Sequence, residues 1–205
     1  MVEKADVRRG YDALGETYVS QRNQEVTAED WPSSFPSGSR VLDAGCGPGR
    51  PVLTSLCETT DPIGLDFSRE QLRLAAAAVP DVPLVQGDLG TLPFTDGTFD
   101  VVIALWSLIH VPAAEHRHVI EEFARVLAPG GEVILNEGIE EWSGTNPDWL
   151  DSGVAMEWHL AGASTTREQL EGAGFVVETE WRGADTLAED DDESPWAFFR
   201  ARLAA

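Results

Sequence analysis

The segment that decides the fold is Val41-Leu42-Asp43-Ala44-Gly45-Cys46-Gly47-Pro48-Gly49-Arg50. An apolar run ends at Asp43, glycine then occupies every second position, and a helical stretch follows. Glycine accepts positive φ and lets the backbone approach a ligand closely. The free N–H groups at the start of the next helix favour a negative group. The segment therefore predicts a strand, a ligand-binding turn and a helix.

Two features of this turn argue against a dinucleotide site. The dinucleotide fingerprint requires its third glycine at position 50, where this chain has Arg50. Asp43 would also place a carboxylate where a pyrophosphate is repelled, whereas a ligand with a positive group would suit it. A phosphate-binding P-loop is excluded because no Gly-Lys-Ser/Thr follows the glycines.

From Ser39 onward, short apolar runs alternate with helical stretches, which predicts a parallel sheet covered by helices. Residues 182–195 have no helical period, so the last two strands should run antiparallel to each other. Strands are expected at Arg40–Asp43, Ile63–Asp66, Pro83–Gln86, Phe99–Leu105, Gly131–Asn136, Phe175–Trp181 and Trp196–Arg202. Helices are expected at Val2–Gln24, Arg50–Glu58, Ser68–Val79, Ala113–Leu127 and Thr165–Gly174, with an irregular insert at Gly138–Ser164 and Thr165 or Thr166 as a cap.

An acidic residue closes the second predicted strand, and another follows the third. Asp66 lies 21 residues after Gly45. At that offset a carboxylate can accept hydrogen bonds from both hydroxyl groups of a ribose. Asp88 could accept a hydrogen bond from an amino-substituted base, or it could form an Asx-turn after Gly87. Together with the glycine turn, these residues predict a nucleoside-binding edge of the sheet.

Six motifs in this order resemble class I S-adenosylmethionine-dependent methyltransferases of the small-molecule, type 11 branch. They are VLDAGCGPGR, IGLDFS, QGDLGTLPF, FDVVIALWSLIHV, FARVLAPGGEVIL and TTREQLEGAGF. The resemblance implies an α/β, Rossmann-like, doubly wound sheet of seven strands, in the order 3-2-1-4-5-7-6 with strand 7 antiparallel. It implies S-adenosyl-L-methionine as cofactor and methyl transfer to a small molecule as the reaction. The alternatives are a non-catalytic protein that binds this cofactor and an NAD-dependent oxidoreductase.

The resemblance also implies which residues contact the cofactor. Tyr11 and Tyr18 resemble N-terminal tyrosines that close over the cofactor. Their spacing equally suits residues on one face of a helix that pack into the core. The other implied contacts are Asp43, Gly45, Cys46 and Gly47 at the methionine end, Asp66 at the ribose, Phe67, Asp88 and Leu89 at the adenine, and Leu105 and Trp106 beside the methyl group.

Methyl transfer requires alignment of the acceptor and exclusion of water, and a base only if the acceptor arrives protonated. His110, just after the fourth strand, is the candidate catalytic base, with a packed structural histidine as the alternative. Glu137 is the reserve candidate. His116 and His118 face different directions on a helix and are expected to be solvated, so no metal site is expected.

Aromatic residues outside the alternating strands and helices are candidates for the acceptor site, because they can stack on a flat or cationic molecule. The alternative is that they form a small core of the insert. The candidates are Trp142, Trp149, Trp158 and His159 in the insert, with Trp31 before the sheet. The expected division is a helical cap at 1–38, a cofactor-binding core at 39–137, a lid-like insert at 138–165, and the last helix and strands at 166–205.

Composition narrows the class of protein. The 205 residues suit one domain of ordinary globular composition. Fourteen Lys and Arg against 36 Asp and Glu give a net charge of −22, which disfavours a nucleic-acid partner. Lys4 is the only lysine, and so acidic a surface suits a salt-adapted cytoplasm. The alternative is an ordinary acidic surface together with a GC-rich genome that favours Arg. The acidic run 189–193 is expected to be a solvated loop.

Neither a membrane span nor a secretory signal is evident, so a cytoplasmic location is expected. Cys46 and Cys57 would be about 16 Å apart on one helix, too far for a disulfide. The acceptor should be a small molecule, because the fourth-strand motif differs from those of methylases that act on nucleic-acid or protein amino groups. Whether the protein is a monomer or a homodimer is left open.

Overall fold

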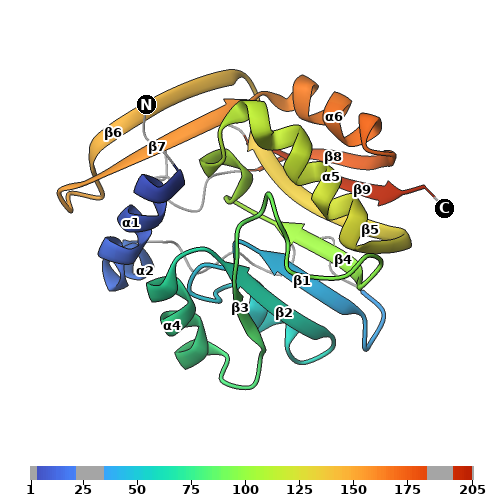
Figure 1. The fold of residues 1–205 in the computed structure, drawn as a ribbon, viewed down its shortest axis with the longest axis horizontal. Coiled ribbons are helices and arrows are strands. Elements are labelled where there is room, and N and C mark those ends of the chain that lie inside the picture. Colours follow the sequence, from blue (N-terminus) through green and yellow to red (C-terminus); the bar gives the residue numbers. More distant parts are fainter. Residues whose placement is uncertain (1–3, 22–34, 184–195, 205) are drawn as a thin grey trace.

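The computed structural model describes residues 4–21, 35–183 and 196–204. Its centre is a seven-stranded sheet in the order β3-β2-β1-β4-β5-β9-β8, with helices packed against it (Figure 1). The strands are β1 (Arg40–Ala44), β2 (Asp61–Asp66), β3 (Leu84–Gln86), β4 (Phe99–Ala104), β5 (Leu127–Gly138), β8 (Phe175–Gly183) and β9 (Trp196–Leu203). The helices are α1 (Lys4–Leu14), α2 (Glu16–Gln21), α3 (Val52–Leu56), α4 (Arg69–Ala78), η1 (Leu108–His110), η2 (Ala113–Glu115), α5 (His116–Val126) and α6 (Ala163–Gly172).

The predicted topology is confirmed. Strands β1 to β5 are parallel to one another, and β9 lies between β5 and β8 and runs antiparallel to both. When the separate two-stranded sheet of residues 141–149 and 154–161 is left out of the numbering, this is the order 3-2-1-4-5-7-6 with the seventh strand reversed. The carboxyl ends of β1, β2, β3 and β4 therefore meet at one edge, where ligands of such sheets bind.

The core explains why the strand sequences are almost continuously apolar. In β4, Val101, Val102 and Ile103 are all buried, as expected for a strand covered on both faces. Helix α5 buries Ile120 and Phe123 against one face of the sheet. At about 25 cal/mol per Å² of apolar area, such burial is the main favourable contribution to folding.

The helix boundaries differ from the predictions where glycine interrupts the chain. The expected single helix at Val2–Gln24 is two helices, because Gly15 has a φ of +46° and breaks the run between α1 and α2. Helix α6 begins after Gly162, with a φ of +84°, so the predicted caps Thr165 and Thr166 lie inside it.

The insert is not irregular, which corrects the prediction. Strands β6 (Glu141–Trp149) and β7 (Val154–Ala161) form an antiparallel hairpin that packs on α1 (Figure 1). Strand β6 is exposed along most of both faces, so its sequence lacks the alternation of apolar and polar residues that marks a strand. Leu150 and Asp151 turn the hairpin with positive φ.

Both cysteines are free, Cys46 buried and Cys57 exposed, which confirms that they do not pair. Within the described residues, no helix has the length and apolar character needed to cross a membrane. The acidic run 189–193 and Trp31 lie outside the described residues.

Candidate active site

The glycine turn crosses the carboxyl edge of the sheet at its centre. Gly45 donates its N–H to the carbonyl of Leu65 at 2.7 Å and has a φ of +89°. A Cβ on Gly45 would overlap the Cβ of Ser107, which follows β4. Only glycine therefore satisfies both the backbone conformation and the close approach of the two segments.

Asp66 closes β2 directly beside this turn. Its carboxylate accepts the N–H of Gly47 and the N–H of Ser68, both at 2.8 Å. Burial raises the pKa of Asp66 to about 6, although these two hydrogen bonds act in the opposite direction. At neutral pH the carboxylate is charged and lies in the wall of a cavity, where it can accept hydrogen bonds from hydroxyl groups of a ligand.

Asp88 occupies the corresponding position after β3. Its Oδ1 accepts the N–H of Gly90 at 2.7 Å, which is the Asx-turn that the sequence left open as an alternative. The same oxygen lies 3.3 Å from Nζ of Lys4 on α1. Asp88 nevertheless lines the cavity, so its structural and binding roles are compatible.

The segment after β4 is held in an uncommon conformation. Trp106 has a φ of +56°, and its N–H donates to Oδ1 of the fully buried Asn136 at 2.6 Å. The indole ring packs edge-to-face on Trp196, with centroids 4.9 Å apart. Such a backbone persists only where its surroundings fix it, and here it places Trp106 and Ser107 in the wall of the cavity.

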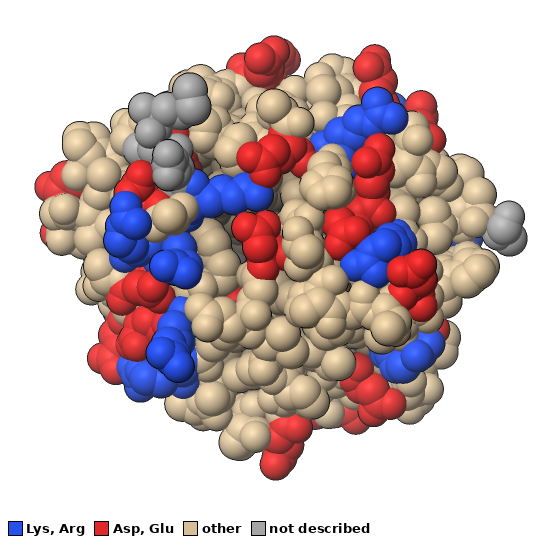
Figure 2. Space-filling view, viewed as in Figure 1, with Lys and Arg blue, Asp and Glu red and all other residues tan. Residues whose placement is uncertain are grey.

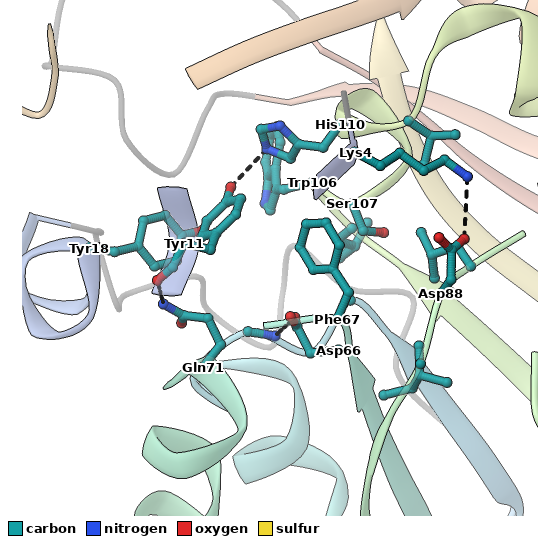
Figure 3. Close-up of a pocket in the computed structure, with 17 residues that line it drawn as sticks. Lys4, Tyr11, Tyr18, Asp66, Phe67, Gln71, Asp88, Trp106, Ser107 and His110 are labelled. Atoms are coloured by element: carbon teal, nitrogen blue, oxygen red, sulfur yellow. Dashed lines mark hydrogen bonds and ion pairs between the residues drawn. The ribbon is translucent and has the colours of Figure 1, made fainter. Parts of the chain in front are cut away.

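Tyr11 on α1 and His110 on η1 are joined by a buried hydrogen bond (Figure 3). The Tyr11 hydroxyl lies 2.7 Å from Nε2 of His110, and Nδ1 lies 3.1 Å from the carbonyl of Glu157 on β7. Because a carbonyl only accepts, Nδ1 carries the proton, and in the neutral ring Nε2 is left to accept from Tyr11. Burial lowers the pKa of His110 to about 4, so the ring is neutral near pH 7.

These groups surround one cavity of roughly 650 Å³, including space open to solvent at its mouth. The predicted site residues that line it are Tyr11, Tyr18, Gly45, Gly47, Asp66, Phe67, Asp88, Leu89, Leu105, Trp106 and His110.

Two predicted cofactor residues lie outside this lining. Asp43 is buried in β1 beneath the turn. Cys46 packs with Leu53 and Val79, and burial raises the pKa of its thiol well above the ordinary value.

The predicted acceptor residues separate into different environments. Trp149 packs against Tyr11 and Tyr18, with ring centroids 5.9 and 5.7 Å apart, and Trp158 packs against Trp149 and His110. These two tryptophans therefore lie behind the groups that line the cavity. Trp142 is 52% exposed on the outer strand of the hairpin, and His159 on β7 lies 3.6 Å from Glu157.

His116 corrects the prediction of a solvated histidine. It is fully buried, with Nε2 2.8 Å from the carbonyl of Val111 and Nδ1 3.4 Å from Glu137. Glu137, the reserve base, is also fully buried and lies against His116 and Thr166 rather than in the cavity lining. His118 is exposed, as expected.

Several lining residues were not identified from the sequence. Lys4, Gln71 and Ser107 all line the cavity. Lys4 stood out only as the single lysine, and Ser107 only as a neighbour of Trp106. Gln71 carried no signal, because one amide in the first turn of an amphipathic helix is ordinary.

Charges on the surface are mixed rather than separated. On the face drawn in Figure 2, Lys and Arg side chains lie beside Asp and Glu side chains. Examples among the described residues are the pairs Arg73–Glu70 and Arg117–Glu121. No basic stripe of the kind that binds a nucleic-acid backbone is seen on that face.

Comparison with known proteins agrees with this geometry. Residues 41–131 match the model of a methyltransferase domain. Sterol 24-C-methyltransferase of Saccharomyces cerevisiae is 27% identical over 90% of this chain and 50% of its own length. 27-O-demethylrifamycin SV methyltransferase of Amycolatopsis mediterranei is 39% identical over 49% of this chain and 39% of its own length. The chain thus spans about half or less of these curated relatives.

The fold is shared with solved structures as well. A structure described as an S-adenosylmethionine-dependent methyltransferase from Methanosarcina mazei superposes with a TM-score of 0.72 at 21% identity. The alignment covers 83% of this chain and 94% of that one. Residues 41–131 therefore match a methyltransferase domain by sequence, and the shared fold agrees with S-adenosylmethionine as the cofactor.

The residues present fit this cofactor. Gly45 and Gly47 both have positive φ, and neither places a side chain between the backbone of the turn and a ligand. Asp66 and Asp88 provide carboxylates at the ends of adjacent strands, suited to ribose hydroxyls and an amino-substituted base. Neither carboxylate suits a pyrophosphate.

Proposed function

We propose that this chain transfers the methyl group of S-adenosylmethionine to a small, uncharged acceptor that carries an acidic hydroxyl group, either a phenol or an enol. When bound, S-adenosylmethionine supplies a methyl group on a positively charged sulfur, which needs no further activation by the protein. The protein must then bind both molecules, orient the acceptor and receive its proton.

The observation that carries this proposal is the direction of the Tyr11–His110 hydrogen bond. The proton of Tyr11 is directed to Nε2 of His110, so the Tyr11 oxygen has only lone pairs left for a ligand. Tyr11 can then accept a proton from the acceptor while it passes its own to His110. His110 is thus proposed as the catalytic base, acting through Tyr11.

The strength of this base indicates the kind of acceptor. With a pKa of about 4, His110 is a weak base, because its charged form is penalised by burial. A weak base is effective only when the hydroxyl group is already acidic. A phenol or an enol meets this condition, and its ionisation activates both the oxygen and the conjugated carbon.

The charges in the wall support an uncharged acceptor. Among the described lining residues, Lys4 is the one cation, and it is paired with Asp88 and Glu115. The other charged lining groups are the carboxylates of Asp66 and Asp88. A phosphate or carboxylate on the acceptor would lack a partner and would be repelled. The acceptors named for the two relatives, a sterol and 27-O-demethylrifamycin SV, are small molecules.

The test uses a series of phenols whose pKa values span about 7 to 10, with S-adenosylhomocysteine as the measured product. Tyr11→Phe should lower kcat about tenfold to hundredfold for the least acidic phenols and progressively less for the more acidic ones. His110→Asn should show the same dependence. An equal loss of kcat for all the phenols would contradict proton transfer through Tyr11 and would indicate that Tyr11 only shapes the cavity.

Binding experiments separate the alternative functions. Stabilisation by S-adenosylmethionine without turnover of any acceptor would favour a non-catalytic binding protein. Stabilisation by NAD but not by S-adenosylmethionine would favour an oxidoreductase. The Phe67 ring and the nucleoside contacts of Asp66, Asp88 and Leu89 belong to the same proposal and are tested by these titrations.

The proposal extends to the division of the chain and its setting. Residues 39–137 would bind the cofactor, with 1–38 and the insert 138–165 as covers and Trp149 and Trp158 as backing for the acceptor site. A net charge of −22 would suit a salt-adapted cytoplasm. The free energy of unfolding should then rise between 0.1 M and 2 M KCl, and an unchanged value would contradict salt adaptation.

A further inference from the structure

A group of buried polar side chains lies outside the cavity lining, where β5, α5 and α6 meet. It consists of His116, Glu137 and Thr166, each fully buried. Nδ1 of His116 lies 3.4 Å from Oε2 of Glu137, and Thr166 donates its hydroxyl to the same oxygen at 3.3 Å. Among the described residues, His116 is the one basic side chain within ion-pair distance of Glu137. The proposed reaction uses none of these groups, so the cluster needs another explanation.

The hydrogen bonds of this cluster indicate how many protons it holds. Nε2 of His116 lies 2.8 Å from the carbonyl of Val111, and because a carbonyl only accepts, Nε2 carries a proton. Oε1 of Glu137 accepts the N–H of Gly138 at 2.8 Å. If Nδ1 had no proton and Glu137 were charged, a lone pair would face a buried carboxylate oxygen, which is unfavourable. The pair must therefore hold one more proton, on Nδ1 or on the carboxyl group, and this proton joins His116 to Glu137.

The other nitrogen of the His116 ring holds the turn that carries His110. Val111 follows His110 directly, lines the cavity and closes η1 by donating its N–H to the carbonyl of Leu108 at 2.9 Å. This turn spans three residues and has no side-chain cap. The bond from Nε2 to Val111 therefore ties the end of a short turn to His116, and through His116 to Glu137 on the interior strand β5.

The place of this turn matters because the His110 ring makes one short contact with a separate element. Its Nε2 lies 2.7 Å from the hydroxyl of Tyr11 on α1 (Figure 3). Such a bond is lost by about 3.6 Å, so a displacement of about 1 Å is enough to break it. A misplacement of about 1 Å in a reacting group can cost about a hundredfold in rate. The backbone that carries His110 must therefore be fixed from behind.

We infer that the Glu137–His116 pair positions the proposed catalytic base, because it holds the η1 turn where Nε2 of His110 meets the Tyr11 hydroxyl. His116 supplies the bond to the turn, and Glu137 fixes the orientation of the His116 ring by sharing a proton with it. Both are positioning residues, since neither lines the cavity. Glu137, the reserve base of the sequence analysis, thus receives a different role. The inference rests on the proposed function, in which His110 acts through Tyr11.

The test measures kcat on the same phenol series with saturating S-adenosylmethionine. His116→Leu removes the bond to Val111 and should lower kcat about tenfold to hundredfold for the least acidic phenols and progressively less for the more acidic ones. The calorimetric affinity for S-adenosylhomocysteine should change less than about threefold. In Tyr11→Phe protein, which already lacks the bond to His110, His116→Leu should lower kcat less than about twofold further. A purely structural role would show neither pattern.

A conservative variant separates the hydrogen bond from the charge at position 137. Glu137→Gln keeps an amide that can donate to Nδ1 and an oxygen that can accept from Gly138, so kcat should stay within about threefold of wild type. Glu137→Leu removes both groups and should reproduce the loss seen in His116→Leu. The matched control is Phe123→Leu, which shortens a fully buried side chain on α5 about two turns beyond His116. It should destabilise the fold without any dependence of kcat on phenol acidity.

Two kinetic outcomes would overturn the inference. They are an equal loss of kcat for all the phenols in His116→Leu, and a loss in Glu137→Gln as large as in Glu137→Leu. If the leucine variants do not fold, nitrogen NMR of the wild-type protein with labelled histidine replaces them. A His116 Nδ1 that neither carries nor accepts a proton would contradict the pair, and a shared proton would support it. Tyr11→Phe without a dependence on acidity would instead overturn the proposed role of His110, so the two failures are distinguishable.

Discussion

The two sides of the cavity are built in different ways. The sheet side is held by contacts close in sequence, such as the bond from Gly47 to Asp66, which are 19 residues apart. The cover, made of α1 and the β6–β7 hairpin, is held by distant contacts, such as the bond between Tyr11 and His110, 99 residues apart. The sheet side therefore leaves a local motif in the sequence, whereas the cover depends on packing between remote segments.

The two sides also differ in charge. Burial raises the pKa of Asp66 to about 6 and lowers that of His110 to about 4. Near pH 7 the sheet side thus presents a carboxylate at Asp66, whereas the His110 ring on η1, to which Tyr11 of the cover is bonded, is neutral. This difference fits a division in which the sheet side binds the nucleoside and the cover faces the acceptor.

The largest expected effect concerns the packing of the cover. Trp149→Ala should lower the free energy of unfolding by about 4 kcal/mol, because it removes a large ring packed against Tyr11, Tyr18 and Trp158. Urea unfolding measures this change. The control Trp142→Ala, at a 52% exposed position of the same hairpin, should cost less than about 0.5 kcal/mol. Similar losses in both variants would show that the hairpin does not pack as described.

The next effect concerns the glycine turn on the sheet side. Gly45→Ala should weaken S-adenosylhomocysteine about hundredfold, or about 3 kcal/mol, because the new Cβ meets Ser107. The control is Gly38→Ala. Gly38 also has a positive φ, at +79°, but the space around it is open, so this variant introduces backbone strain without steric overlap. Calorimetry measures binding. Equal binding by both variants would show that the close approach of Gly45 to Ser107 is not the reason why glycine is required there.

The smallest effect is the pH dependence of binding. Hydroxyl donors favour charged Asp66, so affinity for S-adenosylhomocysteine should fall as pH drops below about 6, by at most tenfold per unit. Protein stability should change in the opposite direction. The raised pKa means that burial of the charge destabilises the fold above pH 6, and this cost is relieved as pH falls toward 3.8. Calorimetry between pH 5 and 8 tests the first expectation, and Asp66→Asn should bind weakly without this dependence.

Much of the sheet side could be predicted from the sequence. The strand order, the turn at Gly45 and Gly47 and the place of Asp66 after β2 were expected and are found. The hairpin at β6–β7 was missed because the exposed faces of β6 remove the alternation that identifies a strand. His116 was expected to be solvated because helical spacing alone does not show that β5 carries Glu137 beside it.

The sequence by itself determined the parallel sheet and the glycines and acidic residues at its carboxyl edge, because apolar runs, glycine spacing and acidic strand ends are local properties of the chain. Only the tertiary structure decided the direction of the Tyr11 proton and the burial of His116. Each of these depends on which donors and acceptors meet when distant segments pack and water is excluded. Such pairings have no fixed spacing along the chain.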